Sequence, residues 1–327
     1  MIDKSKPLDL GGIFNVTFRL LKETFSRNII IAAVFIIPAG IVFSFGMNSF
    51  FNSLIETFNP PYRSVAQFEN FKHGLSIFSL MGIYIATSIV FMLGYLAMLI
   101  GITYVSCTAL DGKRISLSAA FEKIFSVTYL RIIGQRLLMV LAFTAFISVA
   151  AFIIFLIGLA DSALLKFIGV LVLIAVILFL LFLYFRWYFA FIAIVNEDIG
   201  PVQSFMKSYT LVTGYWWRTF GLIILTSITA QFIVSIITTP FSFAIMWDFI
   251  AQYFKMFLKG HFQQNDPYVF LQLFRSLGFS FGIIIILSTI LQSLITPLFN
   301  IVLYYDLKIR KNEFPLEGAD ALISPVD

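Results

Sequence analysis

The chain has 327 residues, of which 60% are hydrophobic and only 12% are charged. A soluble domain of ordinary composition carries about twice that share of charge, so the sequence excludes a typical soluble protein and indicates a membrane protein. The net charge of +5 comes from basic residues scattered between apolar runs, which favours orientation in a membrane over binding to nucleic acid. The single cysteine, Cys107, excludes an internal disulfide.

Six apolar runs are each long enough to cross a hydrocarbon core as a helix, which takes about 20 residues. None of these runs alternates with a period of two, and lipid offers the backbone no hydrogen-bond partners, so each run is predicted to be helical. We therefore predict an all-α polytopic membrane protein with six transmembrane helices. The runs cover residues 29–47, 77–104, 137–160, 164–185, 219–247 and 277–304.

Three similar amphipathic segments precede the first, third and fifth runs. Each is too polar to span a membrane, and its apolar residues recur at helical spacing, which is typical of a helix lying in the interface. The chain is thus predicted to be one membrane domain over residues 1–327, with a polar tail over 313–327. This domain is predicted to consist of three similar units, each an interfacial helix followed by two spans, over about 1–110, 111–198 and 199–312. Chance likeness between amphipathic helices is the alternative. The segments are 9–27, 116–136 and 199–218, and they align Phe14 with Phe121 and Phe205, and Phe18 with Phe125 and Tyr209.

Basic residues are distributed unevenly between the two sides of the predicted helices. Sixteen of the 22 Lys and Arg residues fall on the side of both chain termini. The positive-inside rule then places both termini in the cytoplasm, and we expect a multi-pass protein of the bacterial inner membrane. The polar start of the chain does not resemble a cleaved signal peptide.

The fifth and sixth runs carry polar residues spaced by four, which places them along one face of each helix. Two interpretations stay open: hydrogen bonding between packed helices, or a polar path or headgroup pocket. These faces contain no ionisable residue, which argues against ion-coupled transport. Gly278 and Gly282 form a small-xxx-small packing pattern. The polar faces comprise Ser227, Gln231, Ser235 and Thr239, and Ser288, Gln292, Thr296 and Asn300.

Aromatic and basic residues gather where the fifth run begins and where the sixth ends. Such residues set the depth of a helix at the headgroup level, and their cations suit an anionic surface. We also expect Asp306 to pair with neighbouring cations, and Glu197 and Asp198 to be solvated helix caps. The outer segments 48–76 and 248–276 are each long enough for a short surface helix. The predicted anchors are Lys207, Trp216, Trp217, Arg218, Tyr304, Tyr305, Lys308 and Arg310.

Motifs that carry catalysis are absent from the sequence. It has no GxSxG elbow, no phosphate-binding glycine loop and no HExxH, and its two histidines, His73 and His261, lie far apart. We expect no enzyme activity, no cofactor and no metal. The predicted function is a membrane scaffold or a lipid-associated accessory module, with anionic lipids and a membrane protein or second copy as partners. The alternative is a transporter or lipid-translocating protein that uses the two polar faces.

Three short segments resemble a known family. Residues 195–201 (VNEDIGP), with the positions that follow them, resemble a block of the glycerophosphoryl diester phosphodiesterase membrane domain and of related multi-pass bacterial proteins. The opening segment 8–18 and the closing segment 303–310 are similar to the family's first and last motifs. The resemblance implies the membrane topology. In the named enzymes a soluble catalytic barrel follows this domain, whereas here about 20 residues follow the last run and roughly 250 would be needed, so hydrolase activity is not expected. The matching later positions are Lys207, Ser208, Leu211, Gly214, Trp217, Arg218, Phe314, Leu316 and Glu317.

Overall fold

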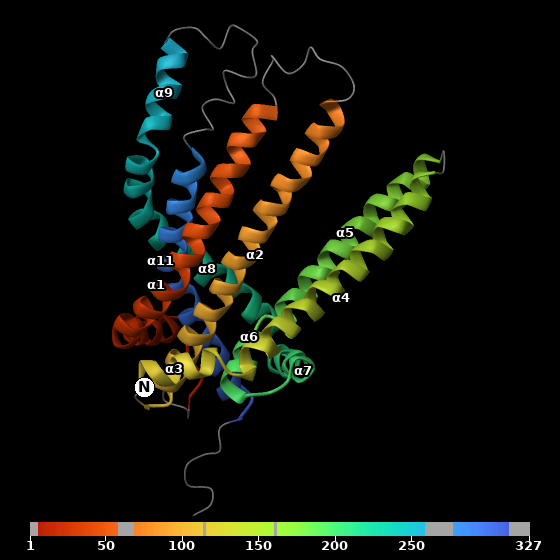
Figure 1. Cartoon of the computed structure of the whole chain (residues 1–327). Helices are drawn as coiled ribbons and strands as arrows, with labels where there is room; N and C mark the ends of the chain where they lie inside the picture. Colours follow the sequence, from red (N-terminus) through yellow and green to blue (C-terminus); the bar gives the residue numbers. More distant parts are fainter. Residues whose placement is uncertain (1–5, 58–68, 114–115, 160–161, 259–276, 314–327) are drawn as a thin grey trace, which may run out of the picture. The chain divides into compact units, whose positions relative to one another are not determined.

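The structure is a computed structural model that describes residues 6–57, 69–113, 116–159, 162–258 and 277–313. These residues are almost entirely helical and contain no strand (Figure 1). Six of the helices are long and apolar enough to cross a membrane. The predicted fold class, an all-α protein with six transmembrane helices, is confirmed. The predicted tail beyond Glu313, residues 58–68 and 259–276 of the two outer segments, and with them His261, lie outside the described residues.

The helices fall into two classes by length. The long ones are α1 (Leu10–Thr57), α2 (Glu69–Leu110), α4 (Val127–Gly158), α5 (Ala163–Arg186), α8 (Trp216–Ile245) and α11 (Leu277–Arg310). The short ones are α3 (Leu117–Ile124), α6 (Ala190–Glu197), α7 (Pro201–Val212) and α9 (Trp247–Leu258).

The three amphipathic segments end differently. The first continues into the span as one helix, α1, because residues 19–28 contain no glycine, proline or capping break. In the second, Ser126 accepts a hydrogen bond from the Thr128 N–H and starts a new helix. In the third, Gly214 has φ +87°, a left-handed conformation that suits glycine and separates α7 from α8.

Two short helices add to the predicted elements. Helix α9 lies in the outer segment where a short helix was expected. Helix α6 was not predicted, because the fourth run was expected to end at residue 185. Its residues from Ala190 to Val195 are all buried. The apolar sequence FIAIV was the available signal, but it is too short to identify a span.

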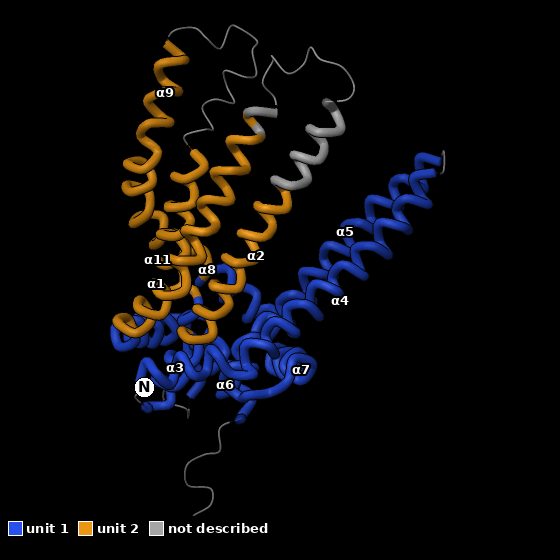
Figure 2. The backbone as a smooth tube through the Cα atoms, viewed as in Figure 1, with its two compact units in different colours: residues 1–24, 103–226, 297–327 blue, residues 25–102, 227–296 orange. Residues whose placement is uncertain are grey.

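The chain divides into two compact units, each described by itself (Figure 2). Unit 1 contains residues 1–24, 103–226 and 297–327, and unit 2 contains residues 25–102 and 227–296. Helices α3 to α7 belong wholly to unit 1, whereas α1, α2, α8 and α11 each contribute residues to both units.

In unit 2 the long helices approach one another at glycines. A Cβ added to Gly278 of α11 would lie 2.6 Å from the Asn48 Cα of α1, and one added to Gly282 would lie 2.8 Å from the Ser44 Cα. On α2, a Cβ at Gly94 would lie 3.0 Å from the Phe35 carbonyl oxygen. The predicted small-xxx-small pattern is therefore a helix-packing surface, as is common in membranes.

In unit 1 helices α4 and α5, which contain the third and fourth predicted spans, run side by side as a hairpin (Figure 1). They approach closely where Gly169 of α5 faces Ile157 of α4. Only 6% of the residues in the apolar window of each helix are buried. Leu, Ile, Val and Phe side chains cover the remaining surface, which suits contact with acyl chains.

Candidate functional site

Asn196, Glu197 and Asp198 end helix α6 and connect it to several other segments of unit 1. The Glu197 carboxylate accepts hydrogen bonds from the Tyr304 hydroxyl at 2.6 Å and the Lys308 ammonium at 2.8 Å. The Tyr305 hydroxyl lies 3.2 Å from the Asn196 side-chain oxygen. The prediction of a solvated cap is wrong for Glu197, because this side chain is largely buried among cations and a tyrosine.

A buried carboxylate, Asp306, joins the start and the end of the described chain. Asp306 is 0% exposed and forms ion pairs with Arg218 and Arg310. It also accepts the Leu8 N–H at 2.8 Å, while both guanidinium groups donate to the Leu8 carbonyl oxygen at 2.9 Å. The predicted pairing of Asp306 with a neighbouring cation is confirmed for Arg310. The sequence did not indicate Arg218, 88 residues earlier.

Most predicted interfacial anchors have protein partners. Tyr304 and Tyr305 are buried, so their rings pack inside unit 1. Trp216 stacks on Phe220 with ring centroids 5.2 Å apart, whereas Trp217 is 78% exposed. The predicted cations Lys207, Arg218, Lys308 and Arg310 each form an ion pair with Glu or Asp.

The residues of the two predicted polar faces differ in exposure. Gln231, Thr239 and Gln292 are exposed, and the other five are half-buried. The Gln231 amide lies 3.4 Å from the Ser235 hydroxyl on its own helix. In unit 1 Asn300 accepts a hydrogen bond from the Tyr188 hydroxyl at 3.1 Å. Both interpretations of these faces, hydrogen bonding between packed helices and a polar path or headgroup pocket, stay predictions. The half-buried members are Ser227, Ser235, Ser288, Thr296 and Asn300.

Sequence reasoning missed the polar residues that α8 buries. Thr226 and Thr238 are almost fully buried and donate to backbone carbonyl oxygens one turn earlier in the same helix, at 2.8 and 2.9 Å. They lie beside the predicted face rather than on it. Spacing by four therefore did not separate the buried side of α8 from the exposed side.

Helix α7 buries two serines and exposes two large apolar side chains. Ser204 and Ser208 are fully buried, whereas Val202 and Met206 are 65% and 64% exposed. The Ser208 hydroxyl donates to the Arg186 carbonyl oxygen at 2.7 Å and accepts the Phe189 N–H at 3.1 Å. It thereby satisfies backbone groups between α5 and α6, where the helical hydrogen-bond pattern is interrupted.

Replacing Ser208 with Ala is expected to lower the free energy of unfolding by about 1–3 kcal/mol, because a buried N–H and a buried carbonyl lose their partner. Thermal unfolding of the full chain in detergent measures the loss. Ser204→Ala is the matched control, since the Ser204 hydroxyl donates only to the nearby Pro201 carbonyl oxygen among the described contacts. Equal effects of the two substitutions would contradict the assigned role.

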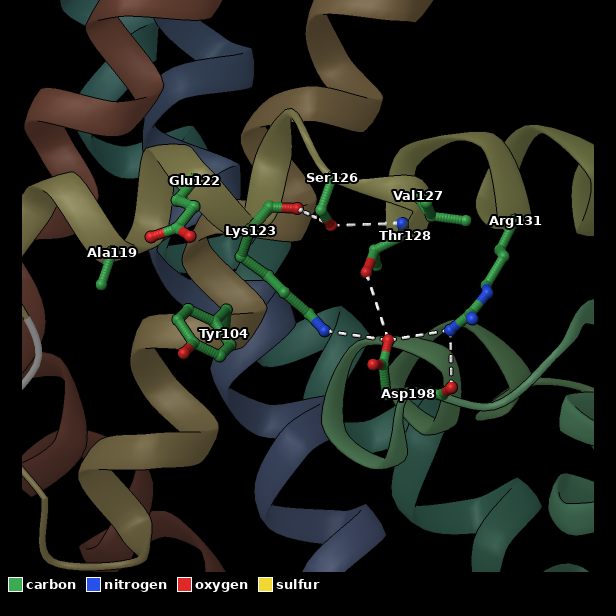
Figure 3. A pocket seen from close by; sticks show the side chains of 9 residues that line it. All are labelled: Tyr104, Ala119, Glu122, Lys123, Ser126, Val127, Thr128, Arg131 and Asp198. Atoms are coloured by element: carbon green, nitrogen blue, oxygen red, sulfur yellow. Dashed lines mark hydrogen bonds and ion pairs between the residues drawn. The ribbon is translucent and has the colours of Figure 1, made fainter.

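A polar cavity, here called the Asp198 pocket, opens beside the end of α6. It has a volume of about 420 Å³. The Asp198 Oδ1 accepts from Lys123 Nζ at 3.1 Å, from Arg131 at 2.8 Å and from the Thr128 hydroxyl at 3.5 Å (Figure 3). Arg131 also donates to the Asp198 carbonyl oxygen at 2.6 Å. The lining residues are Tyr104, Ala119, Glu122, Lys123, Ser126, Val127, Thr128, Arg131 and Asp198.

The backbone of Asp198 determines where its carboxylate lies. Asp198 has φ 57°, a left-handed conformation that ends α6 and that Asp and Asn adopt more readily than most residues. Its side chain is 64% exposed. The hydrogen bond from Lys123, together with the charges of Lys123 and Arg131, lowers the pKa of Asp198 against a smaller opposing effect of burial. The carboxylate is therefore ionised at neutral pH.

A family model described as "Domain of unknown function (DUF7847)" matches residues 17–305. The chain belongs to this family. No curated protein matches the chain. No solved structure matches it either. The matched residues include every residue that lines the Asp198 pocket and end one residue before Asp306. The more specific resemblance to the glycerophosphoryl diester phosphodiesterase membrane domain stays a prediction.

Among the described residues, no group of three or more His, Cys, Asp and Glu side chains could hold a metal ion. The carboxylates of Glu197, Asp198 and Asp306 in unit 1 instead pair with cations. The arrangement of the Asp198 pocket suits binding of an anion, because two cations and a hydroxyl converge on one oxygen atom.

Proposed function

We propose that this chain is a non-catalytic, lipid-associated membrane module whose short helices in unit 1 lie in the headgroup region and engage anionic lipids. Helix α7 carries this proposal. A helix beside water turns its polar face outward, whereas α7 buries Ser204 and Ser208 and exposes Val202 and Met206. An apolar surface of this kind is favourable when it contacts acyl chains.

Other exposed apolar side chains of unit 1 support the same position. Phe125, which follows the last residue of α3, and Trp217, in the first turn of α8, are both more than three-quarters exposed. Moving a side chain of this size out of water is worth roughly 1.5–3 kcal/mol. Tryptophan also prefers the headgroup level of a bilayer.

The proposal includes a location and an orientation. The excess of basic residues on the side of the termini supports a bacterial inner membrane protein with both termini in the cytoplasm. The resemblance of residues 195–201 to the glycerophosphoryl diester phosphodiesterase membrane domain agrees with the same topology. A scaffold role would add a membrane protein partner or a second copy of the chain.

The position of α7 can be tested with a spin label at residue 206, introduced as Met206→Cys in a Cys107→Ala background. In lipid nanodiscs we expect this label to be relaxed more by oxygen, which concentrates in lipid, than by a water-soluble nickel complex. Lys113→Cys is the control, because Lys113 is exposed in the turn after α2, away from α7 in the sequence. A label at residue 206 that is as accessible to the nickel complex as the label at residue 113 would refute the proposed position.

The lipid class can be tested by native mass spectrometry of the full chain released from nanodiscs of equal phosphatidylglycerol and phosphatidylcholine content. We expect the retained lipid to be enriched in the anionic class, since basic residues near a surface attract it. Retained lipid of the same composition as the bulk would refute the proposal.

A second candidate function is translocation of a solute or lipid. It is favoured by the exposure of Gln231 and Gln292, two amide side chains within apolar helices of unit 2. Substitution of both by Leu should abolish a flux without loss of folding if they line a path. Lost stability with unchanged flux would indicate packing instead.

A further inference from the structure

We propose that the Asp198 pocket binds a phosphate monoester group, which replaces the carboxylate of Asp198 on Lys123, Arg131 and Thr128. The inference rests on the proposed function in one respect, because a phosphorylated lipid headgroup is the nearest source of such a group. The same chemistry is offered by a soluble phosphate compound. The test below separates the two sources.

The donors converge on a single point. Lys123, Arg131 and Thr128 reach one carboxylate oxygen, Oδ1, from two different helices (Figure 3). A phosphate oxygen accepts hydrogen bonds from the same donor types, and guanidinium and ammonium groups are its usual partners. The structure thus holds an anion-binding arrangement that one of its own side chains fills.

The donors are held in place before any ligand arrives. Thr128 is 1% exposed and lies in the first turn of α4, where its backbone N–H is capped by Ser126. Ser126 also donates to the Lys123 carbonyl oxygen at 2.7 Å, which fixes the junction between α3 and α4. The first turn of α4 adds a favourable field for an anion.

The carboxylate of Asp198 is a replaceable occupant. It belongs to the turn after α6 and is 64% exposed, and an exposed ion pair of this kind contributes little to stability. The Asp198 carbonyl oxygen can keep its bond to Arg131 when the side chain swings away. The adjoining volume of about 420 Å³ leaves room for the group that carries the phosphate.

The charges around the pocket favour an anion more strongly once Asp198 leaves. Lys123 and Arg131 are balanced there by Asp198 and Glu122. The Glu122 carboxylate points away from the shared oxygen (Figure 3), so departure of Asp198 leaves two cations facing the vacated position. A phosphate monoester carries a charge of about −1.5 to −2 at neutral pH, which matches two cations better than the single charge of a diester.

The decisive variant is Asp198→Asn in the full chain, because Asn removes the charge and keeps the left-handed backbone accessible. Binding of phosphatidic acid in nanodiscs is measured by native mass spectrometry over a range of lipid fractions. We expect Asp198→Asn to bind about two- to fivefold more tightly, the range of an exposed ion pair. We expect Arg131→Gln to bind about tenfold more weakly. Lys22→Gln, which removes an exposed cation of unit 1 outside the pocket, is expected to bind as the unsubstituted chain does.

The outcomes separate this inference from the proposed function. Enrichment of anionic lipid that is unaffected by Asp198→Asn and Arg131→Gln would overturn the proposed phosphate binding in the Asp198 pocket. It would leave the proposed lipid-associated function standing. Lack of any enrichment in the unsubstituted chain would overturn both. Thermal unfolding of each variant shows that weaker binding by Arg131→Gln is not a loss of folding. If soluble glycerol phosphate displaces phosphatidic acid from the chain, the site is assigned to a soluble ligand. If it does not displace the lipid, the site is assigned to the lipid headgroup.

Discussion

Asp306→Asn is expected to lower the free energy of unfolding by about 3–5 kcal/mol, the largest effect of any single substitution considered for this chain. The carboxylate of Asp306 is fully buried, and its loss leaves the charges of Arg218 and Arg310 without their shared partner. The Asn amide keeps one acceptor oxygen for the Leu8 N–H. The expected loss is therefore electrostatic rather than a loss of volume.

Unfolding of the purified chain in mixed micelles, followed by circular dichroism, measures this effect. Asp248→Asn is the control, because Asp248 is an exposed acidic residue in the first turn of α9. The double variant Asp306→Asn with Arg218→Gln should lose less stability than the two single losses added together, since each removes the same interaction. Additive losses, or an unchanged stability for Asp306→Asn, would show that Asp306 and Arg218 are not coupled.

Gly282→Ala is expected to lower the free energy of unfolding by about 1–3 kcal/mol through overpacking. The added methyl group would lie 2.8 Å from the Ser44 Cα, so the backbone of α1 or α11 would have to move. Alanine has the higher helix propensity, so the local preference of α11 opposes the expected result. A loss of stability therefore reports on packing between the helices.

Gly221→Ala is the matched substitution, because Gly221 lies inside α8 and has no atom within 4 Å of the added Cβ. It should leave stability unchanged or raise it by up to about 1 kcal/mol. Both variants are compared by the temperature of unfolding in the same detergent. A Gly282→Ala variant as stable as Gly221→Ala would mean that α1 and α11 do not pack at this position.

The sequence was sufficient for features that depend on local composition. Length and hydropathy identified the six spans, and glycine spacing identified the surface of α11 that packs on α1. The third amphipathic segment was predicted over 199–218, and it contains α7, which begins at Pro201 as a helix-starting proline suggests. The next helix, α8, begins at Trp216 inside that predicted range, after the break at Gly214. The first segment is not separated from its span, because the sequence contains no residue that would break the helix between them.

The candidate site depended on pairs that are distant in the sequence. Asp198 lies 67 residues from Arg131 and 75 from Lys123, so no helical or strand period relates them. Tyr304 and Tyr305 matched the pattern of an aromatic belt, but their hydroxyl groups bind carboxylate and amide groups inside unit 1. Residue type indicates a preference for the interface, and only the fold determines which aromatic residues reach it.

The contact between Leu8 and Asp306 also has a consequence for biosynthesis. Leu8 and Arg218 are made long before Asp306 and Arg310, so the cluster that joins them cannot form while the ribosome is still synthesising α11. Until then the guanidinium group of Arg218 lacks its buried counter-charge. The early helices must therefore enter the membrane before these ion pairs form. Unit 1 acquires its final stability only after α11 has been synthesised and inserted.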